Sequence, residues 1–149
     1  MVTRADIVAE ALTWEGTPFR HQGRSRSGVD CVGLGICVGR SLGLLGDYDI
    51  LNYRRNADGA DLMREFKSQM GRKKPINQAM PGDTFLFRDG QFVIHVGIVL
   101  AVSPRLEIIH AYALNRKVIR CFPDLTRDNQ GLLSDRIQYC FEYPGMSDG

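Results

Sequence analysis

The fold of this chain is decided by the stretch Gly28-Val29-Asp30-Cys31-Val32-Gly33-Leu34-Gly35. Asp30 is a residue type that caps helix N-termini, so the pattern predicts a helix that begins at Cys31 and runs to about Leu42. A thiol in this position lies at the positive end of the helix dipole, which favours its thiolate form. Because the thiolate is the nucleophile, Cys31 is a candidate for covalent catalysis. The alternative is a small buried hydrophobe, which is the commoner role of a lone cysteine at the start of an apolar helix.

Composition indicates an ordinary globular protein. The chain has 149 residues, of which 44% are hydrophobic and 24% are charged, and its net charge is +2. This length fits one domain with a sizeable core, so we expect a single domain over residues 1–149. The balanced charge favours no particular partner, and no long basic block indicates nucleic-acid binding. The longest basic cluster, Arg72-Lys73-Lys74, is expected to be a solvated loop.

No targeting or metal-binding pattern stands out. The segment Met1–Asp6 opens an amphipathic pattern without a basic region followed by an apolar core, so no secretory signal is predicted. No apolar run reaches the length of a membrane span. The four cysteines include no C-x-x-C pair, so we expect no structural zinc site and reduced thiols: Cys31, Cys37, Cys121 and Cys140.

The first half of the chain is predicted to be mainly helical. Thr3, with Asp6 three residues later, resembles a capping box, which predicts a helix that ends near Gly16. Residues 17–29 are expected to form a loop, because glycine, serine and arginine dominate them. A further helix is predicted over residues 58–71.

From Pro81 the apolar period becomes that of strands. Strands are predicted over residues 84–87, 92–101, 106–112, 117–122 and 136–143, with Asp89-Gly90 as a hairpin turn. Helices followed by an antiparallel sheet are an α+β pattern.

Two of the three histidines fall in predicted neighbouring strands. His95 interrupts an apolar strand, where a polar side chain is either satisfied by a partner or functional. If Val102-Ser103 is the turn, His95 lies directly opposite His110, and a shift of the turn by one residue makes them diagonal neighbours. A cysteine, a histidine and a polar residue that orients the histidine are typical of thiol proteases. The alternative is a pair of core histidines that hydrogen-bond each other.

Several segments together resemble the NlpC/P60 cysteine peptidases. In the order that the family has them, they are Gly16-Thr17-Pro18-Phe19, Gly28-Val29-Asp30-Cys31-Val32-Gly33-Leu34, Pro81-Gly82-Asp83, His95-Val96-Gly97-Ile98-Val99 and Ile109-His110-Ala111. The resemblance covers residues 3 to about 143. It is strongest to the phage-type branch, the cell-wall peptidases encoded with tail genes and in gene transfer agents.

This resemblance implies a circularly permuted papain-like α+β fold, with N-terminal helices packed on an antiparallel sheet. It also implies hydrolysis of amide bonds in peptidoglycan stem peptides, typically a D-γ-glutamyl–diamino-acid bond, without a metal or organic cofactor. Residue by residue, Cys31 matches the nucleophile, His95 the general base and His110 the third polar residue. The segment Gly82-Asp83 matches a structural turn of the family and receives no catalytic role.

The loop before the cysteine supplies the candidate substrate-binding residues. Many family members have a tyrosine twelve residues before the cysteine, where this chain has Phe19, so any role that needs the hydroxyl is in question. His21 or Gln22 is a candidate to supply a polar group instead, with a surface role as the favoured alternative for both. Arg24 and Arg26 are candidates to meet the carboxylates of a stem peptide, or else are solvated. Asp30 completes this set.

The resemblance and the missing secretion signal together predict where the protein acts. We expect it to be made in the bacterial cytoplasm and incorporated in the tail of a phage or phage-like particle. Its expected partners are the peptidoglycan stem peptide and tail-tip proteins of a phage or gene transfer agent, with no nucleic acid. Two other functions stay open, a structural tail-tip component with a peptidase fold and a thiol-dependent acyltransferase.

Overall fold

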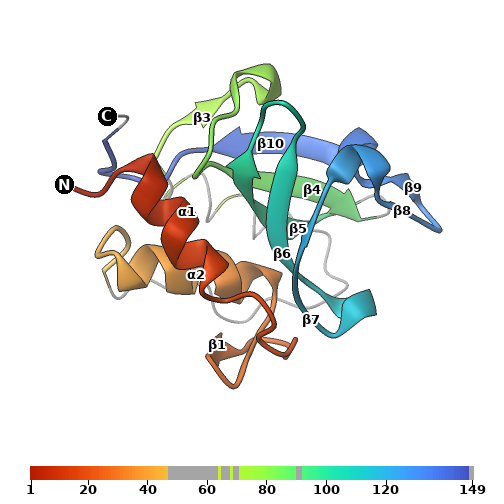
Figure 1. Ribbon diagram of the computed structural model, residues 1–149, viewed down its shortest axis with the longest axis horizontal. Helices are drawn as coiled ribbons and strands as arrows, with labels where there is room; N and C mark the ends of the chain where they lie inside the picture. Colours follow the sequence, from red (N-terminus) through yellow and green to blue (C-terminus); the bar gives the residue numbers. More distant parts are fainter. Residues whose placement is uncertain (47–63, 65–67, 69–70, 90–91, 148–149) are drawn as a thin grey trace.

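The computed structural model describes residues 1–46, 64, 68, 71–89 and 92–147. In this part of the chain, two α-helices accompany a six-stranded antiparallel sheet with the strand order β3-β10-β4-β5-β6-β7 (Figure 1). The predicted α+β fold, with N-terminal helices on an antiparallel sheet, is therefore confirmed. The helix predicted over residues 58–71 falls largely outside the described residues. Neither of the two helices is long and apolar enough to cross a membrane.

The strands follow the predicted pattern closely in the second half of the chain. The sheet consists of β3 (Lys73–Lys74), β4 (Thr84–Asp89), β5 (Phe92–Ala101), β6 (Glu107–Tyr112), β7 (Lys117–Cys121) and β10 (Ile137–Phe141). Two short hairpins stand outside the sheet, β1 (Arg24–Ser25) with β2 (Gly28–Val29) and β8 (Arg127–Asp128) with β9 (Gly131–Leu132). Short 3-10 turns complete the order: η1 (Ile76–Gln78), η2 (Ala113–Asn115), η3 (Pro123–Leu125) and η4 (Leu133–Arg136). The two-residue strands were not predicted, because so short a segment has no readable period.

Helix α1 (Arg4–Leu12) begins with the predicted capping box. The Asp6 backbone N–H donates to Thr3 Oγ1 at 3.2 Å, and the Thr3 N–H donates to Asp6 Oδ2 at 2.9 Å. The helix ends at Leu12, and turns carry the chain to Gly16, where the sequence predicted its end. Reciprocal satisfaction of two backbone donors explains why the helix begins where it does.

Helix α2 (Cys31–Ser41) begins at Cys31, as predicted, because the Asp30 carboxylate accepts the Gly33 N–H at 2.7 Å. Its middle is held by Tyr143, whose buried hydroxyl donates to the carbonyl of Gly35 at 2.6 Å. The Asp30 cap and the Tyr143 hydrogen bond together hold the first half of α2 in place.

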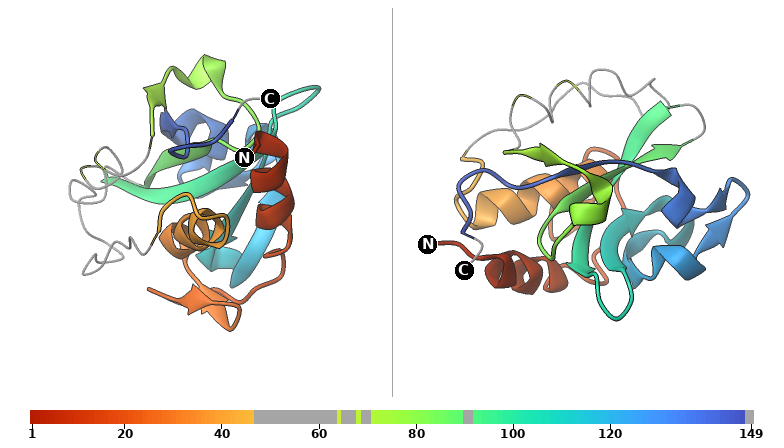
Figure 2. Two further views of the ribbon diagram at one scale, coloured as in Figure 1. Left: turned by 90° about the vertical axis from the view of Figure 1, so that its left-hand side faces the viewer. Right: turned by 90° about the horizontal axis from the view of Figure 1, so that it is seen from above.

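The sheet has an apolar core on each face. Figures 1 and 2 show α1 and α2 next to each other on one side of the sheet. The helix-side core includes Ile7, Trp14, Leu34, Val38, Leu86, Val96, Ile98, Ile109 and Phe141. The opposite face is covered by Phe85, Phe87, Val99, Ile108, Leu133 and Cys140. Burial of each large apolar side chain contributes about 1.5–3 kcal/mol relative to exposure, so the helix-side core fixes the position of α2 on the sheet.

The pairing of β5 with β6 differs from the directly opposed register. Ile98 lies opposite Ile109 and Val99 opposite Ile108, which centres the connection on Ser103-Pro104, one residue beyond the predicted turn. His95 and His110 are therefore diagonal neighbours, the second arrangement that the sequence allowed. A bulge between Val99 and Ala101 accompanies this shift, and a bulge is not visible in an alternating pattern.

The basic run Arg72-Lys73-Lys74 was predicted to be a solvated loop; Arg72 and Lys73 are exposed, but Lys74 is buried. Lys74 lies in the edge strand β3 and is 8% exposed, and its Nζ is 2.6 Å from Asp83 Oδ2 and 3.2 Å from Glu142 Oε1. Arg4 also pairs with the buried Asp83, at 2.7 Å. The prediction was wrong for Lys74, because the carboxylates that neutralise it come from distant parts of the chain.

Candidate active site

Cys31 lies where the first turn of α2 meets strand β5. Its sulfur makes hydrogen bonds with the backbone of Val96 and with the N–H groups of Val32 and Cys31 itself. The strand that carries His95 therefore contacts Cys31 one residue after the histidine.

The environment of Cys31 keeps the thiol protonated. Burial raises the pKa of the Cys31 thiol to about 12, and the charge of Asp30 adds to the rise, while the backbone hydrogen bonds oppose it. The N–H groups at the start of α2 lower the pKa, as the sequence predicted, but the cost of removing the anion from water is larger. Cys31 therefore needs a proton acceptor before it can act as a nucleophile.

His95 and His110 form a hydrogen-bonded pair. His95 Nε2 lies 2.7 Å from His110 Nδ1, and the two ring centroids are 5.0 Å apart. Phe87 packs against the His95 ring at 5.4 Å, and Tyr112 stacks on the His110 ring at 4.8 Å with an interplanar angle of 18°. Because His110 occupies Nε2 of His95, the nitrogen that His95 can offer to another group is Nδ1.

His110 is a neutral ring at working pH. It is fully buried, and burial together with the neighbouring His95 lowers the pKa of His110 well below its usual range. Its second nitrogen, Nε2, lies 3.4 Å from the Cys121 sulfur. The sequence predicted only a reduced thiol at Cys121, and its place on the predicted strand that follows the strand of His110 was the signal available.

A second polar group holds the Tyr112 ring. The Tyr112 hydroxyl donates to Asp128 Oδ2 at 2.6 Å, and the Arg136 guanidinium donates to the same oxygen at 2.7 Å. Burial raises the pKa of Tyr112 to about 12, with the hydrogen bond and charge of Asp128 adding to the rise, so the hydroxyl stays a donor. Because side chains alternate along a strand, the strand predicted over residues 106–112 puts Tyr112 on the face of His110, whereas no local signal pointed to Asp128 or Arg136.

The Asp30 carboxylate gathers most of the candidate substrate-binding residues. Besides capping α2, it accepts the Gln22 N–H at 2.7 Å and lies 3.2 Å from the Arg24 guanidinium. His21 Nδ1 is 3.9 Å from the same carboxylate, and His21 is exposed. Asp30 therefore ties the β1–β2 hairpin to the end of α2 that carries Cys31, and His21, Arg24 and Asp30 form one cluster.

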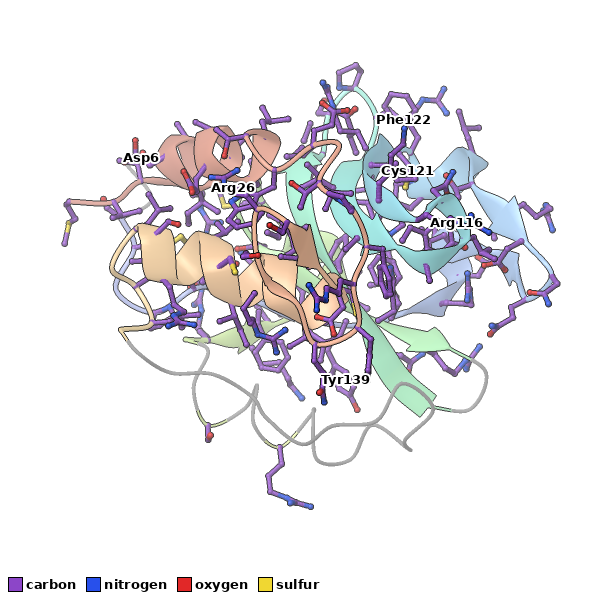
Figure 3. All side chains as sticks on the ribbon, turned by 90° about the horizontal axis from the view of Figure 1, so that it is seen from below. Asp6, Arg26, Arg116, Cys121, Phe122 and Tyr139 are labelled. Carbon is purple, nitrogen blue, oxygen red and sulfur yellow. The ribbon has the colours of Figure 1, made fainter. Side chains whose placement is uncertain are left out.

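Phe19 and Arg26 lie apart from this cluster. Phe19 forms an isolated bridge with Val29 and packs against the helix-side core. Arg26 donates to the Thr13 carbonyl at 2.9 Å, and its guanidinium lies 3.7 Å from the centre of the Trp14 ring, beside α1 (Figure 3). Arg26 is thus directed to the end of α1 rather than to Asp30.

A cysteine at a helix N-terminus, beside a strand with a hydrogen-bonded histidine pair, is typical of the thiol hydrolases. Among the described residues, no group of three or more His, Cys, Asp or Glu side chains is placed to hold a metal ion. The chemistry that these side chains can supply is proton transfer and nucleophilic attack by sulfur.

Comparison with known proteins shows the family. The sequence pattern of the NlpC/P60 family matches residues 16–121, and the chain belongs to this family. The chain is 33% identical over 111 residues to the probable endopeptidase NlpC of Escherichia coli strain K12. That match covers 72% of this chain and 60% of the relative, so the chain corresponds to only part of the relative's length.

Solved structures agree with this assignment. The chain resembles the NlpC/p60 domain of the peptidoglycan hydrolase SagA with a TM-score of 0.61 and 25% identity, over 95% of this chain and 99% of that domain. It shares its fold with an NlpC/P60 family protein from Bacillus cereus ATCC 10987, with a TM-score of 0.66 and 20% identity, over 94% of this chain and 40% of that one. The predicted family is confirmed, and the phage-type branch stays a prediction.

The raised pKa of Cys31 makes a prediction for thiol chemistry. Below its pKa, the thiolate fraction of a group rises tenfold per pH unit. We therefore expect alkylation of Cys31 by iodoacetamide to accelerate about tenfold per pH unit from roughly pH 7 to pH 10. The measurement is a peptide map by mass spectrometry at each pH, with a Cys31→Ser variant as the background. A rate that is already level at neutral pH would indicate a preformed thiolate–imidazolium pair and contradict the expectation.

Proposed function

We propose that this protein is a cysteine peptidase that hydrolyses amide bonds of peptidoglycan stem peptides. In this proposal Cys31 is the nucleophile, His95 the general base and His110 the residue that orients His95. The observation that carries it is the 2.7 Å contact between His95 Nε2 and His110 Nδ1. His95 directly precedes Val96, whose backbone contacts the Cys31 sulfur. Membership of the NlpC/P60 family supports the same assignment.

The proposed reaction has two stages. His95 takes the proton of the Cys31 thiol through Nδ1, and the sulfur attacks the scissile carbonyl. The tetrahedral intermediate collapses to a thioester as the C–N bond breaks, and the His95 imidazolium gives its proton to the leaving amine. Water then attacks the thioester, with His95 again accepting a proton, and releases the carboxylic acid and the free thiol.

The first turn of α2 supplies donors for the oxyanion of each stage. The Gly33 N–H is bound by the Asp30 carboxylate at 2.7 Å, and the Leu34 N–H is bound by the Asp30 carbonyl at 2.9 Å. The N–H groups of Cys31 and Val32 instead face the sulfur. We propose these two groups as oxyanion donors, because they lie next to the carbon that the sulfur attacks.

The finer parts of the proposal concern the substrate and the setting. We propose a D-γ-glutamyl–diamino-acid bond as the one cleaved, with His21, Arg24 and Asp30 at the substrate side of the site. Similarity to a probable endopeptidase and to the domain of a peptidoglycan hydrolase supports peptidoglycan peptides as the class of substrate. We further propose that the protein acts in the tail of a phage or phage-like particle, together with tail-tip proteins, on the strength of the phage-type resemblance.

Digestion of purified peptidoglycan tests the function directly. A peptidase releases muropeptides with a new amine and a new carboxyl terminus, which mass spectrometry identifies together with the bond cut. A thiol acyltransferase would need an added acyl donor, and a purely structural tail component would leave the muropeptides unchanged. Wild-type protein that leaves them unchanged under conditions in which it is folded would contradict the proposal.

Replacement of His110 separates an orienting role from a packing role. The Oδ1 of asparagine can accept the His95 Nε2–H at about the reach of an imidazole Nδ1. We expect His110→Asn to keep turnover within about tenfold of wild type and His110→Ala to lose about a hundredfold. His95→Ala should be the most damaging of the three. Both His110 variants should lose about 1–3 kcal/mol of stability, so turnover is compared per folded molecule.

The opposite ordering would contradict the assignment. If the two histidines are only a buried pair, activity should fall in proportion to the folded fraction. His95→Ala should then be no worse than His110→Ala in kcat, once the melting temperatures have been used to correct for unfolding.

The two arginines of the hairpin should differ in effect. Arg24 pairs with Asp30, whereas Arg26 is bound at the end of α1. We expect Arg24→Ala to lower kcat/KM on a stem-peptide substrate about tenfold, because the Asp30 charge beside Cys31 loses a cation. Arg26→Ala is the matched control and should stay within about twofold. Equal effects of the two replacements would remove Arg24 from the site.

A further inference from the structure

The ring of Tyr112 lies against both histidines of the candidate active site. Its centroid is 4.8 Å from that of His110, with an interplanar angle of 18°, and 5.7 Å from that of His95. Phe87 contacts the His95 ring at 5.4 Å. Because Phe87 belongs to β4 and Tyr112 to β6, aromatic rings reach His95 from the strands on either side of its own strand, β5.

These two aromatic neighbours of His95 are not held in place in the same way. Phe87 is fully buried, so packing fixes its ring. Tyr112 is the last residue of β6 and is partly exposed. A side chain with fewer buried contacts has more freedom to move, so the Tyr112 ring needs a second attachment to keep its place beside the histidines.

The Tyr112 hydroxyl supplies this second attachment. It donates to Asp128 Oδ2 at 2.6 Å, so the axis of the phenol ring is held at one end by β6 and at the other by Asp128. The motion that is left is rotation of the ring about this axis, which the stacking on His110 restricts. The ring therefore presents a fixed surface to the two imidazoles.

Asp128 is itself held on both carboxylate oxygens. Its Oδ1 accepts the Gln130 N–H at 2.8 Å within the β8–β9 hairpin, and its Oδ2 accepts from Arg136 Nη2 at 2.7 Å. Burial opposes the charge, but the hydrogen bonds from Tyr112 and Gln130 and the charge of Arg136 hold the pKa of Asp128 below its usual range. Arg136 is buried in η4, which leads directly into β10, so the acceptor of the Tyr112 hydroxyl is tied back to the sheet.

We propose that Tyr112 is a positioning residue that keeps the His95 and His110 rings aligned, and that Asp128 and Arg136 support it through its hydroxyl. The β8–β9 hairpin stands outside the six-stranded sheet, at the side of the molecule away from the two termini (Figures 1 and 2). Its role in the site is to hold the end of the Tyr112 ring that the sheet does not hold. The consequence for catalysis rests on the proposed function, whereas the consequence for the placement of the rings does not.

The placement of the rings can be measured without any substrate. An aromatic ring shields protons that lie over its face, so the stacked Tyr112 should move the ring protons of His110 upfield in NMR spectra. The chain has three histidines, and labelling of histidine with ¹³C makes their ring signals visible separately from those of other residues. Tyr112→Phe keeps the ring but loses its attachment, and should lose part of this upfield shift. Tyr112→Leu should lose nearly all of it.

Kinetics then test the catalytic consequence. Loss of one net hydrogen bond should reduce kcat of Tyr112→Phe about five- to tenfold per folded molecule. The KM should be unchanged, because misaligned histidines slow the chemical step and leave substrate binding as it was. Tyr112→Leu should lose about a hundredfold in kcat, as misplacement of a catalytic group by about 1 Å does.

A paired replacement tests whether Asp128 acts through the Tyr112 hydroxyl. Asp128→Ala together with Arg136→Met removes the acceptor and its cation at once, so no uncompensated charge stays buried. This pair should lower kcat as much as Tyr112→Phe does, and its addition to Tyr112→Phe should lower kcat no further. Arg127→Ala removes an exposed charge from the same hairpin and is the matched control, in which kcat and the ring shifts should stay as in the wild type.

The results decide between a positioning role and a contact that only holds the hairpin. An unchanged kcat per folded molecule in Tyr112→Phe would overturn the positioning role, as would His110 ring shifts that stay at their wild-type values. A further loss of kcat on addition of the paired replacement to Tyr112→Phe would show that Asp128 does not act through the hydroxyl. If the wild-type protein cleaved no stem peptide, the proposed function would fail, and the ring shifts would still decide whether the Tyr112 hydroxyl fixes the place of the rings.

Discussion

Replacement of Cys31 by alanine is expected to reduce turnover of a stem-peptide substrate by about 10⁴-fold or more, with almost no change in stability. The loss is large because no other group can form the thioester, and what remains is binding and oxyanion stabilisation alone. The stability should stay within about 0.5 kcal/mol, because alanine favours a helix and removes only one atom from a half-buried site. Turnover and urea unfolding, measured on the same preparations, check both halves of the expectation.

Cys37 offers the matched control for this experiment. It lies on the same helix, α2, but is buried in the helix-side core. Cys37→Ala should cost stability through a small cavity and leave kcat per folded molecule unchanged. Retention of more than about a tenth of the activity in Cys31→Ala, or an equal loss in Cys37→Ala, would show that sulfur at position 31 is not the nucleophile.

The features that the sequence predicted well are those encoded within a few residues. The capping box of Thr3 and Asp6 and the cap at Asp30 each need only the next three residues, and all of them form as expected. Alternation along β6 placed Tyr112 on the same face as His110, and the two rings stack. Such signals depend on backbone geometry alone, so they survive folding without help from the rest of the chain.

The features that the sequence missed depend on groups far apart in the chain. Lys74 was interpreted as solvated because its carboxylate partners, Asp83 and Glu142, are not adjacent in sequence. The helix position of Cys31 was expected to favour the thiolate, and its N–H groups do lower the pKa, but burial outweighs them. Cys121 became relevant only when the register of β6 and β7 placed its sulfur beside His110.

These misses change the chemistry that is asked of each residue. In the proposed mechanism, a protonated Cys31 requires that His95 remove a proton during attack, rather than stabilise an existing thiolate. That task requires an unprotonated Nδ1 on His95, which is met when His95 Nε2 donates to His110 Nδ1. The tautomers are therefore as much a part of the proposed site as the distance between sulfur and imidazole.

The largest expected effect on stability is that of Asp83, which the sequence interpreted as part of a structural turn. Asp83 is fully buried and neutralises two cations, Arg4 at 2.7 Å and Lys74 at 2.6 Å, while it also accepts the Met80 N–H at 2.9 Å. Asp83→Ala leaves both cations buried, with Glu142 as their remaining carboxylate. We expect a loss of about 3–5 kcal/mol in the free energy of unfolding, the cost of breaking a buried pair on one side.

The design of the measurement follows from what each variant retains. Asp83→Asn keeps the shape and an acceptor for the Met80 N–H but removes the charge, so its loss should lie between those of wild type and Asp83→Ala. Glu107→Ala breaks an ion pair with the exposed Arg120, 3.2 Å apart, and should cost no more than about 1 kcal/mol. Urea unfolding gives the free energy of unfolding of all three variants, provided that its slope against urea concentration is the same as in the wild type. A loss below about 1 kcal/mol for Asp83→Ala would mean that water reaches Arg4 and Lys74 in the variant. The ion pairs of Asp83 would then not hold α1 and the edge strand β3 to the rest of the sheet.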